Sequence, residues 1–174
     1  MAGAQTLFSL QVFRQETLLY NQCMTILVSA CLLGRNCKYN GGNNRNEKVL
    51  RFVKDKKVIA VCPEQLGGLP TPRSPAEIVC DKVKTNVGTD VDASFREGAD
   101  KALRLIEGMH VDLAILQPRS PSCGTKEIYD GSFSGRLIPG MGVFAEALCK
   151  KGIKVIEPDD LDSLSCSNSY CFCR

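Results

Sequence analysis

The sequence contains no tryptophan, and its single histidine is His110. A zinc centre built from several histidines is therefore excluded, and a Cys–His nucleophile pair is disfavoured. The formal net charge is only +3, so no extended basic surface for nucleic acid is indicated. No apolar run reaches the roughly 20 residues of a membrane span. Residues 1–23 also lack the clean apolar core of a secretory signal. These absences predict a cytoplasmic protein that is not attached to a membrane.

Cysteine, by contrast, is abundant, with ten in 174 residues. Outside an oxidising compartment, so many thiols indicate metal or thiol chemistry rather than disulfides. The chain has about the length of one domain. Its composition, 44% apolar and 24% charged, is sufficient for a buried core. We therefore expect one globular domain whose cysteines serve a site.

Short β-branched runs alternate with amphipathic segments along the chain. The pattern predicts strands at 25–30, 57–62, 112–117 and 153–156, and helices at 46–54, from Asp90 or Asp92 to about 107, and at 142–151. Residues 76–87 predict a hairpin or an edge strand, and the Pro- and Gly-rich segment 63–75 predicts irregular structure. This alternation is typical of an α/β fold, a Rossmann-like open, mostly parallel sheet with flanking helices.

The same pattern suggests three parts of the chain. We predict an N-terminal extension (1–23), a single α/β domain (24–158) and a C-terminal tail (159–174). The tail contains Cys166, Cys171 and Cys173 in a short polar sequence. A disordered end is the simpler interpretation of it, and a metal-binding tail is the alternative.

Three cysteines each follow a strand-like run, in ILVSACLLG, VIAVCPEQLGG and LAILQPRSPSCG. They are Cys31, Cys62 and Cys123. The carboxyl ends of parallel strands meet at one edge of a sheet, where loops build sites. Three thiols in one crevice could be a ligand set with one coordination position left open. The sequence therefore predicts a metal or iron–sulfur centre.

Three further cysteines receive other interpretations. Cys149 lies in a predicted helix and Cys80 in the predicted hairpin, so we expect Cys149 in the core and Cys80 in the core or at a sheet edge. Cys37 lies in the polar loop GRNCKYNGG. It could serve the outer part of the site or be a free thiol.

Four motifs carry a resemblance to a known family. In chain order they are SACLLG, CPEQLGGLPTPR, SPSCG and IYDGSFSG. With them the chain resembles the DUF523 family, which includes the thiouracil desulfidases, over about residues 25–157. The resemblance implies an α/β protein that holds a 4Fe–4S cluster through three cysteines. It also implies removal of sulfur from thiolated uracil compounds without net redox change.

The resemblance places the first and last cluster ligands at Cys31 and Cys123. Some relatives have the second ligand a few residues after the CPE glutamate, where this chain has Gly67 and Gly68. The nearest thiol is Cys62, which we therefore predict as the second ligand, with Cys37 in reserve. Two departures from the family pattern bear on the substrate. Asn40 replaces an acid in CKYNG, and Gln117 replaces a lysine before the SPSCG loop.

The resemblance further implies that Glu64 and Ser120 are catalytic. An iron with an open position could act as a Lewis acid on a thiocarbonyl sulfur. Glu64 could transfer the proton of an attacking water, and Ser120 could hydrogen-bond the substrate or relay that proton. The expected substrate contacts, which could include a phosphate, come from Gly67, Gly68, Arg73 and Ser122.

The expected substrate is thus thiouracil, thiouridine or thiouridine monophosphate, with release of hydrosulfide. Thiolated tRNA is the one nucleic-acid candidate. Two alternatives stay open at this point. The first is a zinc- or cluster-binding module without catalysis. The second is a thiol enzyme that uses Cys123 as its nucleophile.

Overall fold

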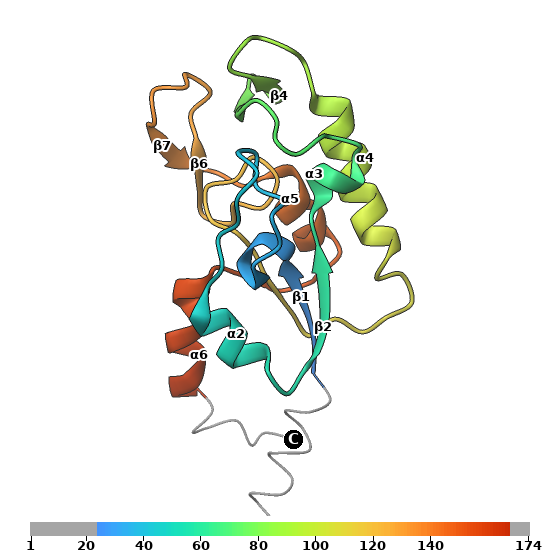
Figure 1. Cartoon of the computed structure of the whole chain (residues 1–174). Coiled ribbons are helices and arrows are strands. Elements are labelled where there is room, and N and C mark those ends of the chain that lie inside the picture. Colours follow the sequence, from blue (N-terminus) through green and yellow to red (C-terminus); the bar gives the residue numbers. More distant parts are fainter. Residues whose placement is uncertain (1–23, 168–174) are drawn as a thin grey trace, which may run out of the picture.

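The computed structural model describes residues 24–167, with side chains described through Leu164 (Figure 1). The predicted extension 1–23, Cys171, Cys173 and the side chain of Cys166 lie outside this part of the chain. No helix in the described residues is long and apolar enough to cross a membrane.

A four-stranded parallel sheet forms the centre of the fold, in the order β2-β1-β5-β8. Its strands are β1 (Thr25–Ser29), β2 (Lys57–Val61), β5 (Leu113–Ile115) and β8 (Val155–Ile156). Every pairing within it is parallel, with Ile26 opposite Val58 on one side and Leu113 on the other. The predicted open parallel sheet is confirmed.

Helices cover both faces of this sheet. They are α2 (Glu47–Val53), α3 (Pro63–Leu66), α4 (Asp92–Arg104), α5 (Val143–Lys150) and α6 (Leu161–Ser167), with short 3-10 turns η1 (Ala30–Leu33) and η2 (Pro158–Asp160). Leu27 packs toward α4 and α5, whereas Ile26 and Val28 pack toward α2 and α6. Successive strand side chains point to opposite faces, so burial on both faces explains the continuous apolar run of β1.

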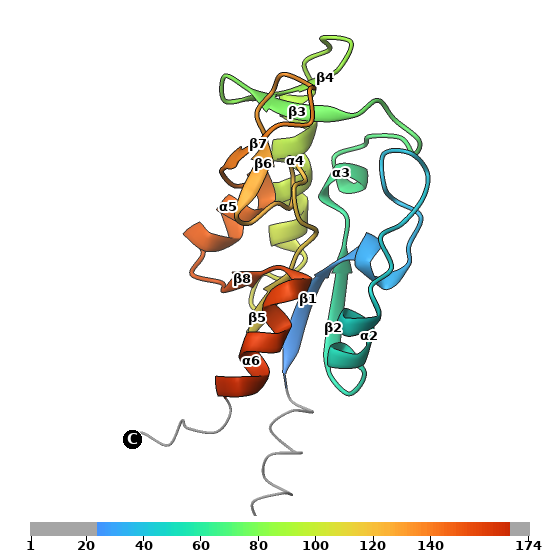
Figure 2. The same cartoon turned by 90° about the vertical axis from the view of Figure 1, so that its left-hand side faces the viewer.

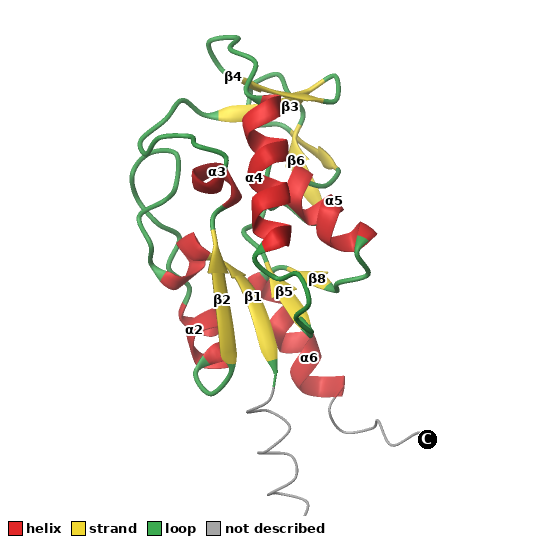
Figure 3. Cartoon of the chain, turned by 90° about the vertical axis from the view of Figure 1, so that its right-hand side faces the viewer, coloured by secondary structure: helices red, strands yellow, loops and turns green. Residues whose placement is uncertain are grey.

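Two antiparallel hairpins stand beyond the carboxyl ends of the strands (Figures 2 and 3). The first is β3 (Ala76–Val79) with β4 (Lys82–Thr85), which confirms the predicted hairpin. The second is β6 (Glu127–Tyr129) with β7 (Leu137–Pro139), in the segment between the predicted strand at 112–117 and the predicted helix at 142–151, where no strand was predicted. Each of its strands has only three residues, which is too short to show an alternating pattern of apolar and polar residues in the sequence.

Four other predictions need correction. The segment 63–75, predicted to be irregular, begins with the short helix α3. Proline at the first helical position has a backbone φ already suited to a helix. The predicted boundary at 158 lies inside the packed chain, since Leu161 is in the core. Cys149 and Cys80 are both exposed. Phe144, Ala145 and Leu148 form the buried face of α5, and Cys149 lies off it.

Candidate active site

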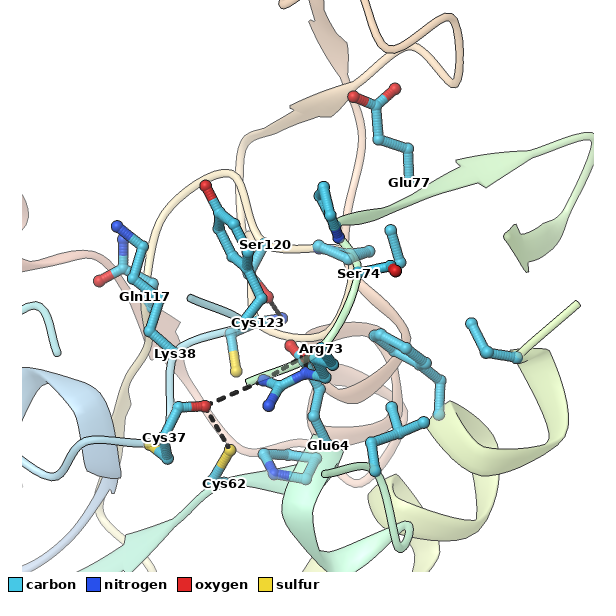
Figure 4. Close-up of a pocket in the computed structure, with 18 of the residues that line it drawn as sticks. Cys37, Lys38, Cys62, Glu64, Arg73, Ser74, Glu77, Gln117, Ser120 and Cys123 are labelled. Atoms are coloured by element: carbon cyan, nitrogen blue, oxygen red, sulfur yellow. Dashed lines mark hydrogen bonds and ion pairs between the residues drawn. The ribbon is translucent and has the colours of Figure 1, made fainter. Parts of the chain in front are cut away.

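A cavity of about 890 Å³ lies between the carboxyl ends of β1, β2 and β5 and the two hairpins (Figure 4). Four thiols line it, those of Cys31, Cys37, Cys62 and Cys123. Cys31 lies in η1, Cys62 directly follows β2, and Cys123 lies in the loop after β5. The structure therefore brings the three strand-end cysteines to one place, as predicted, and adds Cys37.

Cys37 is a buried member of this group, with 3% of its surface exposed. Its thiol is hydrogen-bonded with Cys31, which raises the pKa of Cys37 to about 11. The Cys62 thiol donates to the Cys37 carbonyl oxygen at 3.9 Å. Hydrogen bonding with Cys37, together with burial, also raises the pKa of Cys62. Cys37 is thus part of the cavity wall, which favours the predicted role at the site over that of a free thiol.

Cys123 is the most enclosed of the predicted ligands. Burial raises the pKa of its thiol to about 12, against the opposing hydrogen bonds of Ser29 and Ser122. A reactive cysteine needs a lowered pKa, so that its thiolate is present at neutral pH. The shift of Cys123 is in the other direction, which argues against the nucleophile alternative.

The donor set fits a cluster better than a single metal ion. Among the described side chains, no three of His, Cys, Asp or Glu converge as ligands of one ion would. Cluster thiolates bind different iron atoms, so they need not meet at one point. Four thiols in one wall with no histidine are the soft donors that such a cluster takes.

Glu64 and Arg73 form a nearly buried ion pair at the cavity. The Glu64 side chain is 16% exposed and the Arg73 side chain 8%. Both contacts reach one carboxylate oxygen, Oε2, at 2.8 Å from Arg73 Nε and 2.7 Å from Arg73 Nη2. Glu64 Oε1 has no hydrogen-bond partner in the described part of the chain.

The contacts of Arg73 within the protein argue against the phosphate contact that the sequence suggested. A guanidinium has five N–H donors. Besides two to Glu64, Arg73 directs Nη1 to the Pro70 carbonyl and the Thr71 hydroxyl, and Nη2 to the Cys37 carbonyl at 2.9 Å. Four hydrogen bonds and the ion-pair contact of Nη2 with Glu64 thus direct every nitrogen of the guanidinium toward groups of the protein. Arg73 instead joins the catalytic candidate Glu64 to the loop that holds Cys37.

Ser120 lines the cavity, and its hydroxyl oxygen accepts the N–H groups of Ser122 and Cys123 at 3.1 and 3.2 Å. These bonds form the turn that positions Cys123, and they leave the Ser120 hydroxyl proton free to donate. Ser122 is 1% exposed and does not line the cavity. This placement argues against a direct substrate contact by Ser122.

Gly67 and Gly68 also lie away from the cavity lining. A Cβ on Gly67 would come 2.0 Å from the Ser94 carbonyl oxygen, and one on Gly98 would come 1.9 Å from that of Pro63. The two glycines thus let α3 press directly against α4, which holds the segment carrying Glu64. Gly68 has a φ of +82° and forms a turn. Neither glycine is placed to touch a substrate.

Several of the residues that line the cavity were not predicted from the sequence. Lys38 and Arg119 line the cavity and form no ion pair with a described residue, and Glu77 and Phe133 line it from the two hairpins. Glu77 could have been noticed because it is the single charged residue in the otherwise apolar strand AEIV. Of the two departures, Gln117 lines the cavity, whereas Asn40 accepts the Gly42 N–H in an exposed turn.

The model of the 2-thiouracil desulfurase family matches residues 26–160. The chain belongs to this family. The family prediction is thereby confirmed, and every candidate ligand and catalytic residue lies within the matched part. A relative from Bacillus subtilis (strain 168), the uncharacterized protein YbbK, is 42% identical over 149 residues, covering 80% of this chain and 99% of YbbK.

A solved structure is also similar to this member of the family. It is the [4Fe-4S]-dependent thiouracil desulfidase TudS (DUF523Vcz), with 39% sequence identity and a TM-score of 0.76. The match covers 84% of this chain and 98% of that one. The predicted α/β fold is therefore confirmed by an independent structure.

Proposed function

We propose that this protein is a 4Fe–4S-dependent desulfidase that removes sulfur from a thiolated uracil base or nucleotide by hydrolysis. The family match and the named activity of TudS support it. The observation that carries the proposal is the meeting of Cys31, Cys62 and Cys123 with Glu64 at one cavity. The overall change is C=S plus water to C=O plus hydrogen sulfide, in which no atom changes oxidation state.

In this proposal Cys31, Cys62 and Cys123 hold the cluster. Cys37, hydrogen-bonded with Cys31 and Cys62, supports them. A cluster held by three protein ligands would supply an iron that can act as a Lewis acid on the thiocarbonyl sulfur. Since the pKa values of Cys62 and Cys123 are raised, these two thiols must release protons when they bind iron.

Glu64 is the general base in this scheme. Arg73 holds Oε2, so the carboxylate is fixed in orientation while Oε1 stays free to accept a proton from water. Two-point contact by a buried guanidinium leaves the carboxylate little freedom to turn away from the substrate. The remaining proton of Ser120 can be donated to the substrate, because its oxygen is already held by two backbone N–H groups.

Anaerobic reconstitution tests the proposal. We expect about one 4Fe–4S cluster per chain, measured as iron and acid-labile sulfide, and release of sulfide from thiouracil, thiouridine or thiouridine monophosphate. Cys123→Ser should lose the cluster, and Cys149→Ser, on the outer surface, should keep it. Stoichiometric zinc without labile sulfide would support the binding-module alternative and contradict the proposal.

A further inference from the structure

Ser29 is a buried hydroxyl residue at the carboxyl end of β1, where the strand meets the cavity. It is 2% exposed and lines the cavity together with Cys123. Its Oγ accepts the backbone N–H of Gln117, in the loop that follows β5, at 3.0 Å. Ser29 thus ties the segment that leads to Cys123 to the neighbouring strand of the sheet.

The proton of the Ser29 hydroxyl remains available after this bond is made. A serine hydroxyl has one O–H donor, and the Gln117 N–H occupies only an acceptor site of the oxygen. The Cys123 thiol is hydrogen-bonded with Ser29, and this contact opposes the rise in the thiol pKa that burial causes. A contact that favours the thiolate is one in which the hydroxyl donates and the sulfur accepts. The Ser29 proton is therefore directed at the sulfur of Cys123.

A second hydroxyl contacts the same thiol. Ser122 is 1% exposed, away from the cavity lining, and it is also hydrogen-bonded with Cys123 in a contact that opposes the rise in the thiol pKa. Cys62, by contrast, has the Cys37 thiol as a side-chain partner, and a thiol is a weak donor. Cys123 therefore has stronger side-chain donors beside its sulfur than Cys62 has.

Hydrogen bonds to a metal-bound thiolate withdraw negative charge from its sulfur. They are among the features that set the reduction potential of an iron–sulfur cluster. Since reduction adds negative charge, donors at the sulfur favour the reduced form and raise the potential. Less charge on the sulfur also leaves the metal a stronger electron acceptor, which is the Lewis-acid property that desulfuration needs. Cys123 is 6% exposed, so water competes little for these bonds.

We propose that Ser29, together with Ser122, donates a hydrogen bond to the Cys123 thiolate and thereby strengthens the Lewis acidity of the cluster that Cys123 binds. This inference rests on the proposed function for the presence of the cluster. It makes Ser29 a positioning residue that acts through Cys123, and it assigns Ser29 no part in the transfer of protons.

The reduction potential of the reconstituted cluster, measured by anaerobic titration without substrate, tests this role. We expect Ser29→Ala to shift the potential to a more negative value and to lower the rate of sulfide release roughly 2- to 10-fold, the effect of one hydrogen bond. Ser122→Ala should shift the potential in the same direction. Ser74→Ala removes an exposed hydroxyl from the cavity lining and is the matched control, which should keep the wild-type potential.

The variants Ser29→Thr and Ser29→Val separate the donated proton from the tie between the strands. The two side chains have nearly the same shape, but only threonine keeps the hydroxyl. At equal iron content, Ser29→Val should therefore have a more negative potential than Ser29→Thr. Equal potentials in these two variants would mean that Ser29 only ties the loop after β5 to β1, which overturns the inference and leaves the proposed function intact.

Ser122→Ala decides the matter if every variant at Ser29 loses the cluster. A wild-type potential in Ser122→Ala would then show that hydroxyl donors at Cys123 do not tune the cluster, and a more negative potential would support the inference. Absence of iron and labile sulfide from the wild type would instead contradict the proposed function, and with it this role of Ser29.

Discussion

Two groups of cysteines in this protein differ sharply in their surroundings. Cys31, Cys37, Cys62 and Cys123 line one cavity, whereas Cys80 and Cys149 are exposed. Cys80 lies in the β3–β4 turn with a φ of 46°, and Cys149 lies off the buried face of α5. The difference teaches that position relative to the strand ends separates the thiols that line the cavity from those on the surface. Residue type alone does not distinguish these six cysteines from one another.

Removing thiols one at a time should produce the largest effect and tests this division directly. We expect Cys62→Ser to lose the cluster, Cys37→Ser to retain part of it, and Cys149→Ser to retain all of it. Cys62 is a proposed ligand, while Cys37 acts through its hydrogen bonds with Cys31 and Cys62. Iron and acid-labile sulfide per chain are the measurements. Full loss in Cys37→Ser with retention in Cys62→Ser would exchange the two roles.

Glu64→Gln should separate cluster binding from catalysis within the cavity. The variant should keep a full cluster and lose about 100- to 10,000-fold in the rate of sulfide release, since a glutamine cannot act as a general base. The control is Glu47→Gln, an exposed carboxylate paired with Arg45. Undiminished turnover at full cluster occupancy would exclude Glu64 from the proton transfer.

The variants Arg73→Met and Arg96→Met compare the loss of a buried ion pair with the loss of one at the surface. Arg73→Met leaves Glu64 without its partner, and we expect a loss of about 3–5 kcal/mol in the free energy of unfolding. Arg96→Met breaks an i,i+4 pair with Asp92 whose arginine side chain is 55% exposed, and about 0.5 kcal/mol is expected. Urea unfolding of the metal-free protein measures both. Similar losses in the two variants would show that the Glu64–Arg73 pair contributes no more than a surface pair.

The smallest expected effect is the pH dependence of the metal-free protein. The pKa of Cys37 is raised from 9.0 to about 11 in the folded state, so folding favours the protonated thiol. This contribution is complete below about pH 9 and is lost as pH rises through about 11, roughly 3 kcal/mol in all. Thermal unfolding between about pH 8 and pH 11 should show a shallower decline in Cys37→Ala than in the wild type. The exposed-thiol variant Cys149→Ala should follow the wild type.

The sequence by itself determined the sheet and the meeting of three cysteines. The β-branched runs ending near Ser29, Val61 and Ile115 alternate with helical segments, which favours the parallel pairing that the structure shows. Parallel strands end at the same edge, so Cys31, Cys62 and Cys123 had to approach one another. The family motifs added the roles of Glu64 and Ser120, which stay predictions.

Only the tertiary structure decided the rest of the site. Arg73 reaches the Cys37 carbonyl across 36 positions of sequence, and Glu77 reaches Phe133 across 56. Gly67 is needed for the close approach of α3 to α4, which no pattern near Gly67 reveals. Local patterns report the hydrogen bonds and burial within one strand or helix. Which side chains of distant loops face each other depends on how those elements pack, and that packing assigned Arg73 to Glu64, Cys37 to the cavity wall and Cys149 to the surface.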